Sequence, residues 1–141
     1  MPSDLQPLGL AIKRVQHRHH RTLDAALIEV GTTLAQWDAL RAIARHPESS
    51  SHKLAGLTFQ TDQSFGALAN RMVDRGLIRR VAGEGRAILH HLTREGEAML
   101  GVGNAVADRL LAASFSPLTR AERQQLHALL TKLLAGDAAR G

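Results

Sequence analysis

Apolar residues recur with helical spacing along most of this 141-residue chain, in segments that short breaks separate. Long segments occupy the two ends, residues 5–30 and 93–135, and shorter ones occupy 34–46, 52–57 and 62–75. Apolar residues three or four positions apart share one face of an α-helix, so each segment is predicted to be an amphipathic helix. Alanine and leucine dominate and aromatic residues make up only 3% of the chain, which also favours helices over sheets.

Capping residues and helix breakers mark the expected boundaries of these helices. A serine or threonine before a helix can accept a hydrogen bond from an exposed backbone N–H group, and Glu122 adds a capping box to the last helix. Gly31, Gly76 and Gly136 are expected to end helices, and Pro117 is expected to divide the C-terminal segment into two helices. The expected caps are Thr33, a serine at 49–51, Thr61, Thr93 and Thr119.

Residues 77–92 follow a different pattern. The segments 77–81 and 87–92 are short and partly β-branched, and Gly83 and Gly85 between them allow the chain to reverse. A helix, a tight break, a second helix and then a hairpin form the order of a winged helix-turn-helix. The predicted fold class is therefore mainly α with a small β-hairpin wing, flanked by N- and C-terminal helices.

The length of the chain predicts one domain over residues 1–141. A DNA-binding lobe would span about residues 33–92, with the helices at 5–30 and 93–135 on either side of it in the sequence. A winged helix does not need these terminal helices, and their apolar faces require a partner. A second copy of the chain is the simplest partner, which predicts a homodimer, and packing against their own domain is the alternative.

The charge of the chain favours a nucleic-acid partner. The formal net charge is +5, and 15 arginines stand against 3 lysines. Arginine suits bidentate pairing with phosphate or guanine, although a GC-rich genome would also raise its number. Six of the arginines fall between Arg71 and Arg94, where the acidic residues are only Asp74 and Glu84. This clustering beside the expected wing predicts a surface that binds double-stranded DNA.

Several classes of protein are excluded or disfavoured. The chain has no cysteine, which excludes a disulfide scaffold, a Cys-ligated zinc site and a thiol switch. No apolar run approaches about 18 residues and the N-terminus lacks the pattern of a secretory signal, so we expect a cytoplasmic protein without a membrane partner. Asp24, Asp38 and Ser64 have no evident catalytic partners and no P-loop is present, so no enzyme and no cofactor are expected.

Short motifs in a fixed order carry a resemblance to a known family. They are Thr33-Leu34 with Gln36-Trp37 and Leu40, then Leu54-Ala55, then Leu68, Arg71, Met72 and Arg75-Gly76-Leu77-Ile78, and finally Leu92-Thr93 with Gly96. Together they resemble the multiple-antibiotic-resistance regulator (MarR) family, from about Leu8 to Leu134. The resemblance implies a homodimeric transcriptional regulator that binds an inverted-repeat operator. It also implies repression, usually of a neighbouring gene, and release by a small, often aromatic or acidic, ligand.

The helix at 62–75 is the expected recognition helix. Gln63 could contact adenine edges, and Ser64 could contact a base or a phosphate. Asn70 and Arg71 lie further along and are expected to contact phosphates, and Ala67 lies on the same exposed face. The alternative is that these are ordinary solvated positions.

The first turns of this helix and the wing depart from the family pattern. Asp62 and Ala67 stand where the family often has basic residues, and Asp62 would repel phosphate although it could accept a hydrogen bond from cytosine. The tip of the wing reads GEGRA, in which Arg86 is the expected counterpart of the family's minor-groove arginine. Arg79 and Arg80 lie on opposite faces of one strand, so one is expected to face the DNA.

The resemblance also implies a ligand cleft beside the DNA-binding lobe. By that resemblance, His19, Trp37, Arg41 and Phe59 are the candidate ligand-binding residues. Trp37 could stack on an aromatic ring or serve as a core anchor, and Arg41 or a histidine could meet a carboxylate. His17, His19 and His20 form a cluster that could bind zinc or copper, but no carboxylate is close in the sequence, so no metal site is assigned.

Two alternatives to an operator-binding repressor stay open. One is a protein-interaction or architectural winged-helix module without ligand-controlled operator binding, which the acidic Asp62 and the neutral Ala67 would suit. The other is a metal-responsive regulator that uses the histidine cluster.

Overall fold

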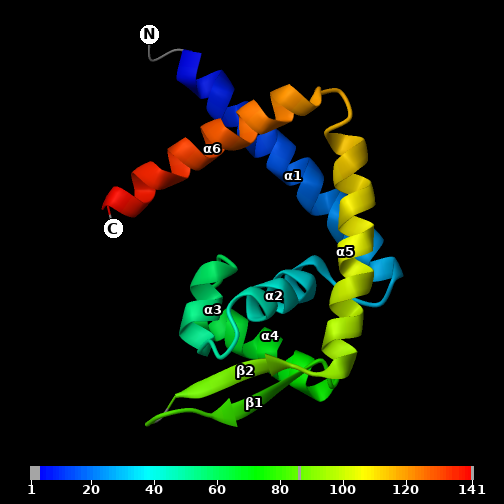
Figure 1. Ribbon diagram of the computed structural model, residues 1–141, viewed down its shortest axis with the longest axis vertical. Helices are drawn as coiled ribbons and strands as arrows, with labels where there is room; N and C mark the ends of the chain where they lie inside the picture. The colour runs from blue at the N-terminus through cyan, green and yellow to red at the C-terminus, as the bar shows by residue number, and fades with distance from the viewer. Residues whose placement is uncertain (1–3, 86, 141) are drawn as a thin grey trace. The chain divides into compact units, whose positions relative to one another are not determined.

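The computed structural model describes residues 4–85 and 87–140. Figure 1 shows helices along most of the chain and one antiparallel hairpin, which confirms the predicted fold class. None of the described helices combines the length and hydrophobicity that a membrane crossing requires. The elements are α1 (Leu5–Glu29), α2 (Leu34–Arg45), α3 (Ser51–Leu57), α4 (Asp62–Asp74), β1 (Ile78–Ala82), β2 (Ile88–Leu92), α5 (Arg94–Ser114) and α6 (Arg120–Arg140).

The chain forms two compact units whose boundary falls within α5, between Ala107 and Asp108. The first unit holds α1 to α4, the hairpin and the first part of α5. The second holds the remainder of α5 and α6. The assignment of residues 33–92 as the DNA-binding lobe, with flanking dimerisation helices, stays a prediction.

Side-chain caps set the helix starts where the sequence predicts them. Each capping hydroxyl accepts a hydrogen bond from the backbone N–H group three residues later, at 3.0–3.2 Å. Glu122 also accepts from the backbone N–H group of Thr119 at 2.9 Å, which completes the capping box. The observed caps are Thr33, Ser50, Thr61, Thr93 and Thr119.

The predicted end of the last helix at Gly136 is wrong, because α6 continues to Arg140. A glycine ends a helix when it adopts a left-handed conformation, as Gly31 and Gly76 do with φ of 96° and 75°. A single glycine inside a helix costs only about 1 kcal/mol relative to alanine. The alanines that follow Gly136 favour helix strongly, so this glycine does not stop it.

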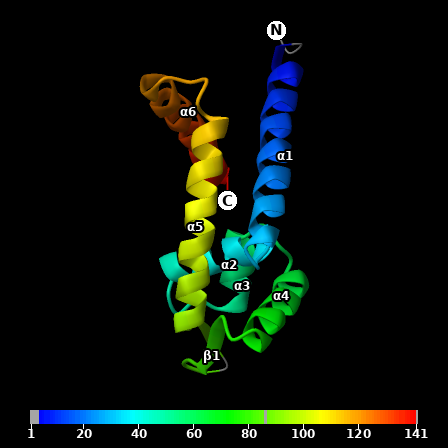
Figure 2. The same ribbon diagram turned by 90° about the vertical axis from the view of Figure 1, so that its right-hand side faces the viewer.

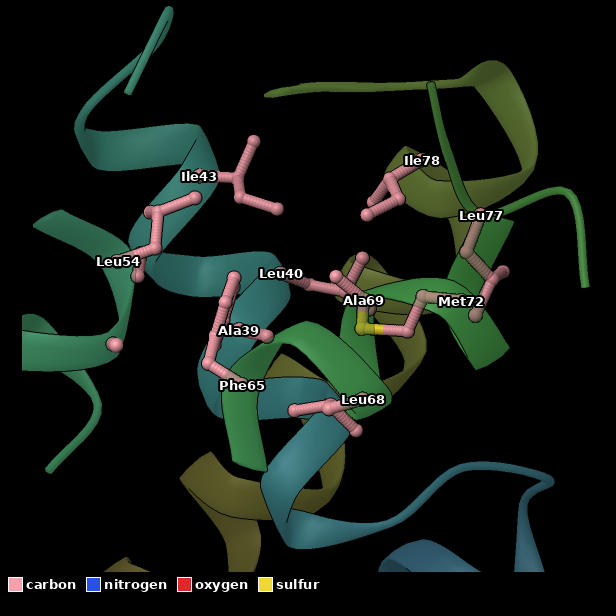
Figure 3. Close-up of a cluster of buried hydrophobic side chains, with 12 residues drawn as sticks. Ala39, Leu40, Ile43, Leu54, Phe65, Leu68, Ala69, Met72, Leu77 and Ile78 are labelled. Atoms are coloured by element: carbon pink, nitrogen blue, oxygen red, sulfur yellow. The ribbon is translucent and has the colours of Figure 1, made fainter. Parts of the chain in front are cut away.

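The first unit has one apolar core between α2, α3, α4 and the start of the hairpin. Figure 3 shows its side chains converging from these elements. The fully buried members include Leu40 of α2, Leu54 of α3, and Phe65 and Met72 of α4. The sequence predicts the stripe of α4, because its apolar residues follow the helical repeat. This core fixes α4 with one face inward and the other outward.

The wing is a two-stranded hairpin in which Ile78 pairs with Leu92 and Ala82 pairs with Ile88. Figure 1 shows it projecting from the lobe. An isolated bridge joins Ser49, between α2 and α3, to His90 of β2. The backbone N–H group of His90 donates to the carbonyl oxygen of Ser49 at 3.2 Å. The sequence of this segment indicates only its capping serines and gives no sign of the bridge.

Glycines let α5 approach the rest of the first unit closely. A Cβ atom on Gly96 would overlap the carbonyl oxygen of Leu77, and one on Gly103 would overlap the indole of Trp37. Helix propensity alone predicts that both glycines weaken α5. The structure shows that their missing side chains make room for neighbours. Figure 2 shows the C-terminal part of α1 and the first part of α5 on either side of α2.

Candidate nucleic-acid interface and ligand cavity

The predicted recognition helix, α4, has two distinct faces. Phe65, Leu68, Ala69 and Met72 are buried in the core of the lobe. The five residues of α4 that the sequence predicts for DNA contact are all exposed and recur at helical spacing on the outer face. They are Gln63, Ser64, Ala67, Asn70 and Arg71.

Neighbouring side chains organise the N-terminal end of α4. The Ser64 hydroxyl donates to the side-chain oxygen of Gln60 at 3.2 Å, so it has an intramolecular partner. His52 of α3 lies with Nδ1 at 3.0 Å from both carboxylate oxygens of Asp62. Both side chains are largely exposed. No sequence pattern indicates this pair, because its members are ten positions apart and belong to different helices.

The C-terminal end of α4 holds a second feature that the sequence analysis missed. Arg75 donates from Nη1 to the side-chain oxygen of Gln36 and from Nη2 to the carbonyl oxygen of Gly31, both at 2.6 Å. Within the described residues, the side chain of Arg71 forms no such hydrogen bond and no ion pair. Two arginines one helical turn apart therefore have different surroundings.

Two arginines of the wing belong to the described residues. Arg79 and Arg80 are exposed and pair in the sheet with His91 and His90. Arg86 lies outside the described residues, so its assignment to a minor-groove contact stays a prediction. The exposed arginines give β1 a basic surface next to α4, the element that precedes it in the chain.

His90 supports the wing from inside. Its ring is fully buried, with Nδ1 at 3.0 Å from the carbonyl oxygen of Ser49, and it meets the ring of Phe65 edge-on. Burial lowers the pKa of His90 below its ordinary value of 6.5, the hydrogen bond to Ser49 opposes this change, and the charges of Arg80 and His91 add to it. The folded lobe therefore favours the neutral ring more strongly than the unfolded chain does.

Trp37, one of the candidate ligand-binding residues, packs as an anchor between α2 and α5. Its side chain is 5% exposed, and its Nε1 donates to the side-chain oxygen of Asn104 at 3.0 Å. The guanidinium of Arg41 lies 4.4 Å from the centre of the indole ring, within the range of a cation–π contact. Of the two roles considered for Trp37, this geometry matches the core anchor.

Arg41 and Phe59, two other candidates, line one cavity of about 250 Å³ between α2 and the end of α3. Phe59 is 97% exposed and has a left-handed backbone, with φ of 58°. Asp38 also lines the cavity, 3.8 Å from Arg41. Burial raises the pKa of Asp38, while the charges of Arg41 and His20 oppose the change. The cavity therefore combines an aromatic ring with cationic groups and the carboxyl group of Asp38.

The histidines of α1 do not assemble a metal site in the described residues. His19 is half-buried on α1 and is not among the residues that line the cavity of Arg41 and Phe59. Across the described chain, no group of three or more His, Asp or Glu side chains is arranged to hold a metal ion.

Comparison with known proteins matches this geometry to one family. A model of the MarR family matches residues 30–87, from the end of α1 to the wing. The HTH-type transcriptional repressor Rv2887 of Mycobacterium tuberculosis is 29% identical to this chain over 133 residues, which are 93% of this chain and 96% of that protein.

Solved structures resemble the fold over most of its length. Rv2887 in complex with salicylic acid has a TM-score of 0.75 at 29% identity, covering 90% of this chain and 96% of the other. Rv2887 in complex with DNA has a TM-score of 0.74 at 27% identity, covering 90% and 97%. A probable transcriptional regulator from Pseudomonas aeruginosa has a TM-score of 0.76 at 30% identity, covering 89% and 95%.

Proposed function

Because this chain belongs to the MarR family of winged helix-turn-helix transcriptional regulators, we propose that it is a homodimeric repressor that binds an inverted-repeat operator and is released by a small aromatic or acidic ligand. The observation that carries the proposal is the exposed polar face of α4, which the core of the lobe holds outward. The curated relatives are transcriptional repressors. We propose that the protein is a regulator without catalytic activity. We also propose that it acts in the cytoplasm, where it binds its DNA.

The proposed contacts divide between bases and phosphates. Gln63 and Ser64, in the first turn of α4, would contact base edges in the major groove, with Ala67 beside them. Asn70 and Arg71 would contact phosphates, which positions the helix without selecting a sequence. The exposed wing residues Arg79 and Arg80, together with Arg86, would contact the backbone or the minor groove. The reported complex of Rv2887 with DNA supports DNA as the partner.

Exposed apolar side chains support the proposed homodimer. On α1, Leu8 is 57% exposed although it lies in the segment predicted to be an amphipathic helix, and Ile12 and Val15 are exposed with it. On α6, Leu133 is 63% exposed, and Leu129 and Leu134 are exposed as well. Such faces are costly in water, and a second copy of the chain would cover them.

The cavity of Arg41 and Phe59 is the proposed ligand site. Arg41 can donate two hydrogen bonds to a carboxylate, and the ring of Phe59 can stack on an aromatic ligand. The volume of about 250 Å³ lies below the range of about 300–1,000 Å³ that is usual for ligand pockets, which favours a small ligand. The complex of Rv2887 with salicylic acid supports this chemical class. Trp37 would act indirectly by holding Arg41, and His19 stays a candidate on α1.

Selection of bound duplexes from a random pool tests the DNA-binding function. The wild-type protein should enrich an inverted repeat, and its affinity for that repeat should fall steeply as salt increases. Equal retention of all duplexes would instead indicate an architectural protein. No retention at low or moderate salt would indicate a protein-interaction module.

The ligand is tested with salicylate as the probe. Salicylate should weaken binding of the selected duplex by the wild-type protein, and Arg41→Met should abolish this response. Phe59→Ala is the second variant, and it should weaken the response without changing the affinity for DNA.

A further inference from the structure

Arg75 joins three parts of the first unit. Its side chain extends from the residue that ends α4 and donates to two acceptors, the carbonyl oxygen of Gly31 and the side-chain oxygen of Gln36. Gly31 lies between α1 and α2, and Gln36 belongs to the first turn of α2. One guanidinium therefore links the end of α4 to the junction of α1 and α2.

The junction that Arg75 contacts is well ordered by hydrogen bonds. The backbone N–H group of Thr32 donates to Leu27 at 3.1 Å and that of Gly31 donates to Ile28 at 3.1 Å, which is the Schellman arrangement at the end of a helix. Thr32 is buried, and its hydroxyl donates to the side-chain oxygen of Gln36 at 3.3 Å. A displacement of the end of α1 would therefore move both acceptors of Arg75.

Arginine suits this position for geometric and electrostatic reasons. Its planar fork can donate to two acceptors at once, and an ionised donor strengthens both hydrogen bonds. Its positive charge also lies next to the C-terminal end of α1, where the helix dipole is negative. Neither acceptor is a carboxylate, so the contact holds a position and does not neutralise the charge.

The residues after Arg75 are attached to α5 in a similar way. The hydroxyl of Thr93 donates to the carbonyl oxygen of Gly76 at 2.5 Å, and its backbone N–H group donates to Leu77 at 3.1 Å. The end of α4 is thus held by Thr93 on the α5 side and by Arg75 on the side of α1 and α2.

We propose that Arg75 is a positioning residue for operator recognition, which fixes the recognition helix α4 to the end of the proposed dimerisation helix α1. Through this contact, a change in the dimer that moves α1 would change the orientation of α4. This inference rests on the proposed function. It assigns Arg75 a role distinct from that of Arg71, the proposed phosphate contact on the same helix.

The test compares Arg75→Met with Arg71→Met. Binding to the selected operator and to an unrelated duplex of equal length is measured at three salt concentrations. Arg75→Met should weaken operator binding about tenfold, the size expected for lost charge-assisted hydrogen bonds. Its salt dependence and its affinity for the unrelated duplex should not change. Arg71→Met should weaken binding to both duplexes and lower the salt slope by about 0.9.

Three further variants separate positioning from a general loss of structure. Gln36→Leu removes one acceptor of Arg75. The double variant that combines it with Arg75→Met should have the same operator affinity as the single variant that binds the operator more weakly, because both substitutions remove one contact. Arg75→Lys keeps the charge and can reach one acceptor, so it should restore part of the affinity. If Arg75→Met lost the same affinity for both duplexes and had a lower salt slope, Arg75 would be a phosphate contact and the proposal would be overturned. Full additivity of the two substitutions in the double variant would also overturn it.

Amide hydrogen exchange without DNA separates this inference from the proposed function. Arg75→Met should increase the exchange rate of the amides at residues 31–36 and leave those of the core of α4 unchanged. If the wild-type protein selects no operator, the proposed function fails, and the exchange result still tests the linkage. Unchanged exchange at residues 31–36 would overturn the linkage itself.

Discussion

The proposed DNA-binding lobe and the terminal helices have the same apolar periodicity, but it leads to different burial in the two regions. In the lobe, the stripes of α2, α3 and α4 meet one another, and Leu40, Leu54 and Phe65 are fully buried. Along α1, Leu23 and Leu27 are buried, whereas Leu8 and residues around it are exposed. Periodicity thus indicates which face of a helix needs cover, and the rest of the fold decides whether the same chain provides it.

The largest expected effect tests the buried core of the lobe. Phe65→Ala should lower the free energy of unfolding by about 3–5 kcal/mol, because it leaves a cavity in a fully buried cluster. Phe59→Ala is the matched control, since Phe59 is 97% exposed and should contribute within about 0.5 kcal/mol. Urea denaturation followed by circular dichroism measures both. Equal losses in the two variants would contradict the distinction between a closed core and an exposed surface.

The next largest effect tests the exposed apolar face of α1. Leu8→Asp places a carboxylate on the exposed apolar face of α1 and should weaken the proposed dimer by about 2 kcal/mol or more, because that charge would be buried without a partner. Gln6→Asp is the control, since residues two positions apart point about 200° apart around a helix. Size-exclusion chromatography with light scattering should give a monomer for the first variant only. A dimer in both variants would remove this face from the interface.

Glycines of α5 distinguish the face that packs on the rest of the first unit from the face that does not. Gly96→Ala should destabilise the protein by about 1–3 kcal/mol, because the new methyl group would overlap the carbonyl oxygen of Leu77. Gly101→Ala meets open space and should stabilise the helix by up to about 1 kcal/mol. Thermal unfolding of both variants checks the opposite signs. Stabilisation by both would mean that α5 does not approach Leu77 closely.

Local chemistry explains what the sequence predicts well. The caps at Thr33, Thr61 and Thr93 depend on residues within three positions, so their hydrogen bonds follow from short stretches of sequence. Gly136 shows where this fails, because a glycine alone does not specify a left-handed end. Periodicity predicts where the helices lie along the sequence. It does not predict that α5 packs closely at Gly96, because that packing depends on a contact with Leu77, which is distant in the sequence.

Of the candidate site, only the exposed face of α4 could be predicted from the sequence. The exposure of Gln63 and Arg71 follows from the buried stripe opposite them. The contacts of Arg75 with Gly31, of His52 with Asp62, and of His90 with Ser49 each join residues that are 10 to 44 positions apart. No local pattern marks such pairs, because the fold alone brings them together.

Acid should weaken the lobe through His90. The pKa of this ring is lowered in the folded protein, so the unfolded chain binds the proton more readily. Stability should therefore be constant above the ordinary pKa of about 6.5 and fall as the pH drops from there towards the folded value. Urea denaturation between pH 8 and pH 5 measures this slope. His90→Gln should flatten it, and an unchanged slope in this variant would assign the slope to another group.

The smallest effect concerns the acidic residue at the start of the recognition helix. Asp62→Asn removes a negative charge from the face proposed to meet DNA, and should tighten binding to an unrelated duplex a few-fold at low salt because phosphate repulsion decreases. His52→Gln should weaken the same binding, since His52 Nδ1 lies at 3.0 Å from both oxygens of this carboxylate and the ring screens it from the phosphates. In the double variant the loss from His52→Gln should shrink, because the carboxylate is absent. Fluorescence anisotropy at two salt concentrations measures these differences. Weaker binding by Asp62→Asn to the operator alone would instead show that this carboxylate contacts a base, and would add Asp62 to the residues that select the sequence.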